Sequence, residues 1–389
     1  MEYSEFSLND LATFKYGKMP NSKNKVATGY PIYTGYKVSG YYSEYMYEEP
    51  MLIVVARGVG GTGDVKLAPA KSYITNLAII IDLNEKICDK KFMQLYLHSL
   101  NLRYLDSGSA QSQITINDLK NLKVKIPKLG EQRKISNFIV LIERKLNLNS
   151  GLISKLEQLS QTIFKRWFID FEFPNAEGKQ YKSSGGEMVE SELGEIPKGW
   201  TIDKLSNIAE IVMGQSPKSD TYNTENIGLP LLNGAADFKN RNLAPSKYTS
   251  DPKKIGKKGD FVFGVRATIG LITELDDSYA IGRGSGIARP LNSLYKEFLY
   301  EVLNSAFNAF QYTASGSVYL NISKNDLNDY KFVIPAINSI DKYHQTTEAL
   351  LIQKENLIQE NKSLQQLRDD LLPKLLSGEI ELPDDLEVG

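Results

Sequence analysis

The sequence predicts an α+β (mixed α/β) fold: two similar globular domains in a pseudo-two-fold arrangement, separated by two long, antiparallel, coiled-coil-like helices. Three observations lead to this fold class. A domain-length pattern occurs twice, a heptad pattern of apolar residues follows each copy, and β-branched apolar runs within each copy alternate with turn-rich segments. The length of 389 residues is enough for two domains that each bury a core.

The duplication is visible in paired segments. Four pairs match: 7–20 with 204–217, 30–35 with 229–234, 52–61 with 261–270, and 107–127 with 315–335. The last pair aligns without a gap at an offset of 208. The earlier offsets differ, which indicates that the two copies have loops of different length.

Each copy is expected to contain both strands and helices. Apolar runs at 51–56, 73–81 and 260–265 are typical of strands. A helix is expected near the end of each copy, and in the second copy its apolar face follows helical spacing. That face contains Leu299, Val302, Leu303, Ala306, Phe307 and Phe310.

A heptad pattern follows each copy and predicts a long helix. The apolar stripe after the first copy contains Ile135, Ile142, Asn149, Leu156 and Ile163. The same positions displaced by 208 are all apolar: Tyr343, Leu350, Leu357, Leu364 and Leu371. We expect these ten residues to pack two helices together, with the first helix roughly 55 Å long. Either relative direction is topologically possible, and we favour the antiparallel one because it gives the domains pseudo-two-fold symmetry.

Asn149 is the polar exception in the stripe. It either fixes the register of the helix pair or is a tolerated side chain beside the irregularity at Gly151. The polar segment that follows the first helix carries Gly185 and Gly186, a signal for turns or flexibility. The expected boundaries are 1–130 for the first domain, 131–172 for the first helix, 173–203 for the linker, 204–338 for the second domain, 339–378 for the second helix and 379–389 for an acidic tail.

Composition excludes several classes of protein. No apolar run is long enough for a membrane-spanning helix, and the acidic N-terminal segment does not resemble a secretory signal, so we expect a cytoplasmic protein. Cys88 is the only cysteine, which excludes an internal disulfide and a zinc site built from cysteines. The net charge is −1, but residues 1–130 carry 16 basic and 12 acidic residues, whereas residues 339–389 carry 5 and 11. The acidic residues are thus concentrated in the C-terminal segment, and each domain can still present a basic face.

Several motifs resemble those of specificity (S) subunits of Type I restriction–modification enzymes. They are LGEIPKGW (193–200), the SGS…ITINDL…IP closure (107–127), IPKLGEQRKI (126–135), LEQLSQTIFKRWFIDF (156–171) and LRDDLLPKLLSGEI (367–380). The second copy departs from the pattern where INSIDKYHQ (337–345) replaces LGEQRKIS.

The resemblance implies that each domain reads one half of a bipartite, asymmetric target in double-stranded DNA. It implies that the helices set the spacer and dock two methyltransferase (M) subunits that bind S-adenosylmethionine. Restriction (R) subunits that use ATP and Mg are optional further partners. The chain itself is expected to bind no cofactor and to perform no chemistry.

No pattern of catalytic residues points to an enzyme. The chain lacks a phosphate-binding P-loop and an Asn-Pro-Pro-Tyr element, and its histidines, His98 and His344, are expected to pack or lie at the surface. The glycine-rich run 58–63 follows a strand without a clear helix start. Two alternatives remain open: a self-contained DNA methyltransferase or nuclease with duplicated DNA-binding domains, and a coiled-coil protein scaffold.

Candidate DNA contacts combine cations for phosphates with amide and guanidinium groups for base edges. In the first domain they are Lys18, Asn21, Lys23, Lys25, Tyr33, Tyr36, Arg57, Arg103, Gln111 and Gln113. In the second domain they are Gln215, Ser216, Lys218, Asn233, Arg266, Arg283 and Tyr319. The basic loop 15–25 could equally be a solvated surface. Arg57 and Arg266 could equally each form a structural salt bridge with an acidic residue, common to both copies. Identity between copies favours a fold or phosphate role, whereas difference favours base reading.

Overall fold

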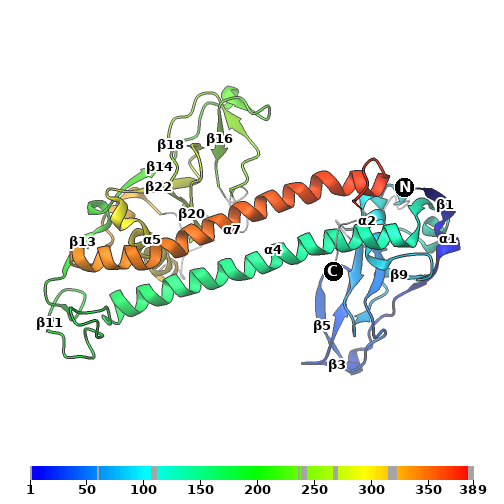
Figure 1. The fold of residues 1–389 in the computed structure, drawn as a ribbon, viewed down its shortest axis with the longest axis horizontal. Coiled ribbons are helices and arrows are strands. Elements are labelled where there is room, and N and C mark those ends of the chain that lie inside the picture. Colours follow the sequence, from blue (N-terminus) through cyan, green and yellow to red (C-terminus); the bar gives the residue numbers. More distant parts are fainter. Residues whose placement is uncertain are drawn as a thin grey trace. The chain divides into compact units, whose positions relative to one another are not determined.

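The computed structural model describes residues 2–58, 61–106, 112–234, 237, 243–265, 270–313 and 322–383. The chain divides into two compact units, each of which is a globular domain together with one part of both long helices. Unit 1 contains residues 1–150 and 359–389, and unit 2 contains residues 151–358. Figure 1 labels the elements of both units.

Unit 1 contains two four-stranded sheets. The first has the order β2 (Ala12–Tyr16), β9 (Ala78–Leu83), β6 (Met51–Val55) and β7 (Val65–Ala68), with antiparallel neighbours. The second has the order β3 (Lys25–Val26), β5 (Val38–Tyr42), β4 (Tyr30–Tyr33) and β8 (Tyr73–Ile74), and its β4–β8 pair is parallel. Every residue of β6 is buried, as expected for an apolar central strand.

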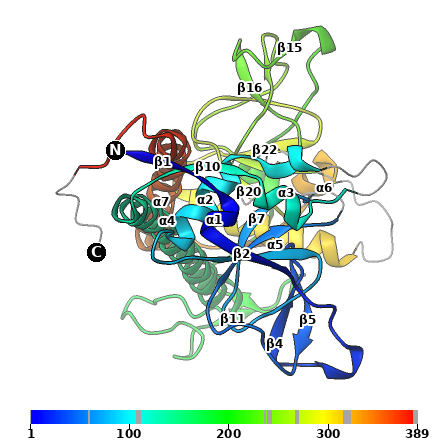
Figure 2. The same ribbon diagram turned by 90° about the vertical axis from the view of Figure 1, so that its right-hand side faces the viewer.

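The two ends of the first domain meet, and short helices complete it. β1 (Tyr3–Ser7) pairs with β10 (Lys123–Pro127), beside which it lies in Figure 2. The helices are α1 (Leu8–Leu11), α2 (Lys90–Ser99) and α3 (Ile116–Lys120), with single turns η1 (Ser22–Asn24) and η2 (Leu102–Leu105). Thr115 and Asp118 form a capping box that starts α3.

Unit 2 repeats this plan. The sheet β14 (Ala209–Met213), β22 (Ser285–Pro290), β19 (Phe261–Gly264) and β20 (Ile272–Glu274) corresponds strand for strand to the first sheet of unit 1. The second sheet has the order β15 (Tyr222–Asn223), β17 (Tyr248–Thr249), β16 (Leu229–Leu232), β21 (Tyr279–Ile281) and β18 (Ile255–Gly256). β13 (Thr201–Lys204) pairs with β23 (Lys331–Ile334). The prediction of two similar mixed α and β domains is therefore confirmed.

The helices of unit 2 also match. They are α5 (Lys296–Thr313) and α6 (Lys324–Asn328), with single turns η4 (Leu205–Asn207), η5 (Ser219–Thr221) and η7 (Ser293–Tyr295). Ser323 and Asp326 form the capping box of α6 at the positions of Thr115 and Asp118 plus 208. The apolar face expected for α5 is buried at five of its six positions, and Phe310 is partly buried.

The predicted long helices are α4 (Leu129–Phe164), which continues as a π-helical turn η3 (Lys165–Ile169), and α7 (Ile337–Ser377). In unit 1, Ile135 shares a core with Leu375, while Asn149 further along α4 bonds to Glu360. In unit 2, Glu157 Oε1 on α4 lies 3.9 Å from Lys354 Nζ on α7. The phenyl ring of Phe164 contacts Tyr343, with ring centroids 6.3 Å apart. Rising numbers on α4 meet falling numbers on α7, so the helices are antiparallel within each unit, as predicted.

The heptad residues lie on the packed face of these helices. The ten stripe positions are all buried or half-buried, and those that are buried are Ile135, Ile142, Asn149, Tyr343 and Leu357. Asn149 donates hydrogen bonds to Glu360 Oε2 at 2.8 Å and to Asn361 Oδ1 at 3.0 Å. Lys145 pairs with the other carboxylate oxygen of Glu360 at 3.1 Å. This polar layer gives Asn149 a specific partner across the helices, which favours the register interpretation.

The sequence leaves turns or flexibility open for the segment 173–203, and the structure has a turn that includes Gly185, next to packed aromatic residues. Phe173 stacks on Trp200 with ring centroids 4.6 Å apart, and both rings belong to the core of unit 2. β11 (Met188–Val189) pairs with β12 (Ile196–Pro197). The few aromatic residues outweigh the many polar ones because their burial stabilises the segment.

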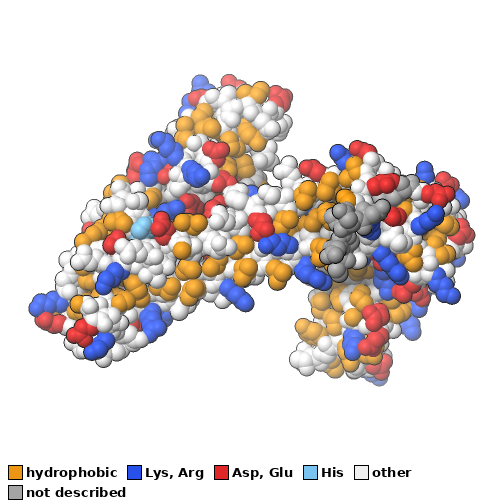
Figure 3. Space-filling view, in the orientation of Figure 1, with side chains coloured by type: hydrophobic (Ala, Val, Ile, Leu, Met, Phe, Trp, Pro, Cys, Tyr) orange, Lys and Arg blue, Asp and Glu red, His pale blue; other side chains and the backbone are white. Residues whose placement is uncertain are grey.

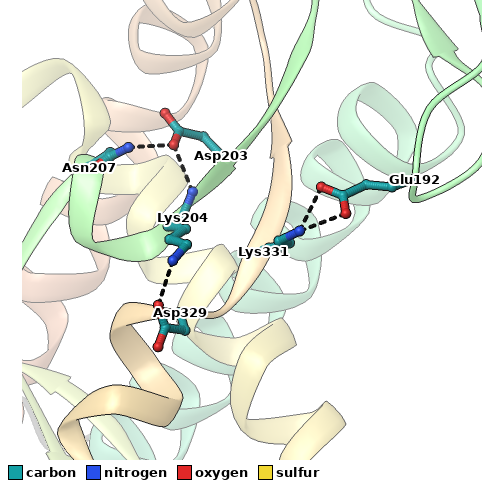
Figure 4. A network of polar contacts seen from close by, with 6 residues as sticks. All are labelled: Glu192, Asp203, Lys204, Asn207, Asp329 and Lys331. Atoms are coloured by element: carbon teal, nitrogen blue, oxygen red, sulfur yellow. Dashed lines mark hydrogen bonds and ion pairs between the residues drawn. The ribbon is translucent and has the colours of Figure 1, made fainter.

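An ion pair and a hydrogen bond also join this segment to the second domain, beside an ion pair within that domain. Lys331 binds the carboxylate of Glu192 at 2.6 Å, and Lys204 binds Asp329 at 2.7 Å (Figure 4). Asp203 accepts a hydrogen bond from Asn207 in the same network. These pairs are exposed, so they add little stability beside the aromatic contacts. β13 also begins at Thr201, within the range expected for the linker.

Candidate nucleic-acid interface

Three of the predicted residues of the second domain meet at the end of β21. The backbone N–H of Gln215 donates to Ile281 O at 2.9 Å, and that of Gly282 donates to Leu232 O at 2.8 Å. Asn233 follows Leu232 directly, and its side chain lies against Gly282. Gln215, Asn233 and Arg283 are exposed. Three segments thus present amide and guanidinium groups from one edge, which we name the strand-end cluster.

The first domain builds the same edge with different side chains. Lys18 N–H donates to Ile74 O at 3.0 Å, and Thr75 N–H donates to Tyr33 O at 3.0 Å. The strand registers Tyr33 with Ile74 and Leu232 with Ile281 align the two copies. The corresponding sets are Lys18, Thr34 and Asn76 in the first domain and Gln215, Asn233 and Arg283 in the second.

In each cluster, a glycine directly precedes the first residue: Gly17 before Lys18 and Gly214 before Gln215. A Cβ on Gly17 would lie 2.2 Å from the backbone oxygen of Thr75, and one on Gly214 would lie 2.1 Å from that of Gly282. Gly17 and Gly214 also donate equivalent hydrogen bonds, to Ala78 O at 3.0 Å and to Ser285 O at 2.9 Å. Only glycine allows this close approach, which explains why both copies have it.

Arg57 lies two residues after the end of β6, a central strand of the first domain. Its backbone pairs with Gln113, its carbonyl accepts a hydrogen bond from the Tyr36 hydroxyl at 3.0 Å, and its side chain is exposed. The guanidinium forms no ion pair or hydrogen bond with any described residue, so a structural salt bridge is not seen there. Burial raises the pKa of Tyr36, which keeps it a neutral donor.

The glycine-rich run after Arg57 has a packing role. A Cβ on Gly58 would lie 2.2 Å from the Tyr36 hydroxyl, and one on Gly61 would lie 2.2 Å from its ring. Gly63 likewise approaches the backbone of Arg103. Residues 59–60 lie outside the described residues. The glycines at 58, 61 and 63 accommodate a tyrosine ring and a neighbouring turn, which accounts for them without a bound nucleotide.

The remaining predicted residues are dispersed. Lys23, Lys25 and Arg103 are exposed, and Asn21 uses its side chain to accept the N–H of Lys23 at 3.0 Å. Tyr33 and Ser216 are half-buried, and Lys218 is exposed. Gln111, Arg266 and Tyr319 lie outside the described residues. Ile322 N–H donates to Val265 O as Ile114 N–H does to Ala56 O, which supports pairing Arg266 with Arg57.

Sequence reasoning missed one residue of the strand-end cluster, Asn76, and one neighbour of it, Lys254. Asn76 is half-buried at the position that corresponds to Arg283, and the repeat alignment of residues 73–81 could have found it. Lys254 lies beside Ile281, whose N–H donates to its carbonyl at 2.9 Å. The lysine-rich run that contains it was visible in the sequence. Among the described residues, no group of three or more His, Cys, Asp or Glu side chains is placed to hold a metal ion. No described helix is both long and apolar enough to cross a membrane.

Comparisons with known proteins give one consistent result. The family model described as the Type I restriction modification DNA specificity domain matches residues 1–158 and again 197–362. A putative type I restriction enzyme MjaX specificity subunit from Methanocaldococcus jannaschii is 29% identical over 275 residues, which cover 70% of this chain and 62% of that protein. The type I restriction enzyme HindI specificity subunit from Haemophilus influenzae is 23% identical over 368 residues, covering 78% and 80%.

A solved structure supports the fold. The S subunit of a Type-I restriction-modification system from M. genitalium superimposes with a TM-score of 0.67 at 18% identity, covering 96% of each chain. The chain spans less than two thirds of the length of the M. jannaschii relative. Two matches to one family model, one on each copy of the duplicated domain, together take in most of the chain, which therefore belongs to the Type I restriction modification DNA specificity domain family.

Proposed function

We propose that this chain is the DNA-reading subunit of a type I restriction–modification enzyme and performs no chemistry itself. The observation that carries the proposal is the repeated strand-end cluster. Its backbone hydrogen bonds are the same in both domains, while the side chains at its three positions differ. Two readers of unlike half-sites require this combination of a constant frame and variable contacts.

The side chains suit different bases. Arg283 can bond guanine in a bidentate manner, and Gln215 and Asn233 can do so with adenine. The first domain offers Lys18 and Asn76 instead, so its preferred half-site is different. Arg57 and its counterpart Arg266 are shared by both copies, and we assign them to phosphates, which are the same in every sequence.

The helices have a separate role in this proposal. The antiparallel packing of α4 and α7 within each unit is suited to hold a fixed spacer between two half-sites of duplex DNA. We assign the methylation chemistry to two methyltransferase subunits that bind S-adenosylmethionine and dock on the helices. Restriction subunits that use ATP and Mg are optional further partners of the same complex.

Alanine substitution in one cluster is expected to alter one half of the target only. Replacing Gln215, Asn233 or Arg283 should cost about 1–3 kcal/mol for each base contact that is lost. Sequencing of methylated sites made by the complete complex would then show relaxed recognition in the second half-site. Lys18→Ala and Asn76→Ala are the matched controls and should relax the first half-site. Relaxation of the same half by variants from both domains would contradict the assignment.

Calorimetry of the purified chain with S-adenosylmethionine tests the absence of chemistry. We expect no heat of binding from this chain alone, and binding once the methyltransferase subunit is present. Saturable binding by the isolated chain would instead favour a self-contained methyltransferase.

A further inference from the structure

Unit 2 carries an exposed group of lysines on one edge of its second sheet. One lies directly before β17, and the other four lie between β17 and β19, two on each side of β18. We name them the lysine edge: Lys247, Lys253, Lys254, Lys257 and Lys258. In Figure 3, Lys and Arg side chains are grouped on the surface over the part of unit 2 that contains β14 and β18.

Internal ion pairing does not account for these lysines. Lys253 binds Asp251 at 2.6 Å. The side chains of the other four members form no ion pair or hydrogen bond with any described residue. Four like charges on one edge repel each other, so their placement costs stability unless an anion binds there.

The lysine edge adjoins the strand-end cluster. The carbonyl of Lys254 accepts the N–H of Ile281 at 2.9 Å, and the carbonyl of the same Ile281 accepts the N–H of Gln215 at 2.9 Å. The carbonyl of Lys247 accepts the N–H of Leu231 at 2.8 Å, two residues before Asn233. Lys247 and Lys254 therefore continue the surface that presents the candidate base-reading groups, and Lys257 and Lys258 extend the lysine edge past the other end of β18, which runs antiparallel to β21.

The duplicated domain shows that the fold does not need these lysines. Tyr47 bridges Ser72 in the first domain as Gly256 bridges Tyr279 in the second, so Glu48 and Glu49 correspond to Lys257 and Lys258. Glu48 is bound internally, by Lys71 at 2.9 Å and by the Tyr45 hydroxyl at 2.6 Å. Equivalent backbone positions thus carry acidic side chains in the first domain and basic ones in the second.

We propose that the lysine edge binds the phosphate backbone of duplex DNA beside the half-site read by the second domain, a contact that the first domain lacks. The proposal rests on the proposed function. A regularly charged polyanion suits four or five lysines spread along an edge better than a single small anion does. A lysine that neutralises a phosphate releases a counterion. The slope of log affinity against log salt is negative, and each contact should increase its magnitude by about 0.9.

Salt-dependent binding by the chain in complex with its methyltransferase partner tests this proposal. The triple variant Lys254→Gln, Lys257→Gln, Lys258→Gln should bind the same methylation target with a slope smaller in magnitude by about 2–3. The matched control Lys179→Gln, Lys182→Gln, Lys198→Gln changes the net charge equally, away from the lysine edge, and should leave the slope unchanged.

The reciprocal variant Glu48→Lys, Glu49→Lys should increase the magnitude of the slope. It gives the first domain the positive charges that Lys257 and Lys258 give the second domain. An unchanged slope in the lysine-edge triple variant, or an equal fall in the control, overturns the proposal. An unchanged slope in the reciprocal variant overturns the equivalence of the two edges as DNA contacts. If the unmodified complex does not need this chain to bind DNA, the proposed function fails instead, so the two failures are distinguishable.

Discussion

Replacing Gln132 with leucine is expected to destabilise unit 1 by about 3 kcal/mol, because it leaves one buried and two part-buried backbone groups without partners. The Gln132 side chain is fully buried at the start of α4. Its Nε2 donates to Ile87 O at 3.0 Å and to Pro127 O at 2.8 Å, and its Oε1 accepts the N–H of Asp89 at 2.8 Å. These bonds join α4 to the residue that caps α2 and to the end of β10.

Hydrogen exchange would measure this effect locally. The Asp89 amide loses its acceptor in the variant, so it should exchange faster, together with the amides of α2. Asn137→Leu is the matched control, since Asn137 is exposed on the same helix and should change stability little. A loss of less than about 1 kcal/mol in the Gln132→Leu variant would show that the three bonds are not needed.

Gln132 also explains a departure between the two copies. The position 208 residues later is Ile340, which is fully buried in the apolar core of unit 2. The glutamine of the first copy serves an internal contact, and the second copy fills the same place with an apolar side chain. The change from glutamine to isoleucine at this position therefore reflects packing within each unit.

The stability of unit 2 is expected to fall as pH rises from about 4.5 to about 7, because of one buried carboxyl group. Burial raises the pKa of Glu301 to about 7, although hydrogen bonds from Ser160 at 3.0 Å and from Asn304 at 3.4 Å oppose the rise. In this window the folded state binds the proton more tightly than the unfolded state. The unfolding free energy should therefore decrease by about 3 kcal/mol across it and level off above it.

The two tryptophans of the chain make this measurement specific. Trp167 and Trp200 both lie in unit 2, so urea unfolding followed by their fluorescence reports that unit. Comparison at pH 5 and pH 8 should show the difference in the unmodified chain. Glu301→Gln keeps the size and the acceptor for Ser160 but cannot ionise, so its stability should vary much less. An equal pH dependence in both proteins would assign the effect to other groups.

The helix pair and the duplicated frame were predictable because their signals are local or periodic. The heptad stripe needs only the spacing of apolar residues along one helix, and the structure places that stripe on the packed face. The capping boxes of α3 and α6 follow from residues three apart, Thr115 with Asp118 and Ser323 with Asp326. Because equivalent positions here are 208 residues apart, each such feature found in one copy predicts the same feature in the other.

The amino-acid sequence by itself determined the two-copy plan, the long helices and the residue types available for reading DNA. Only the tertiary structure decided which of them share a surface. Gln215, Asn233 and Arg283 meet because β16 pairs in parallel with β21, and Lys254 joins them because β18 pairs with the other side of β21. Pairing between distant short strands depends on the burial of a whole domain core, and no local pattern of residues specifies it.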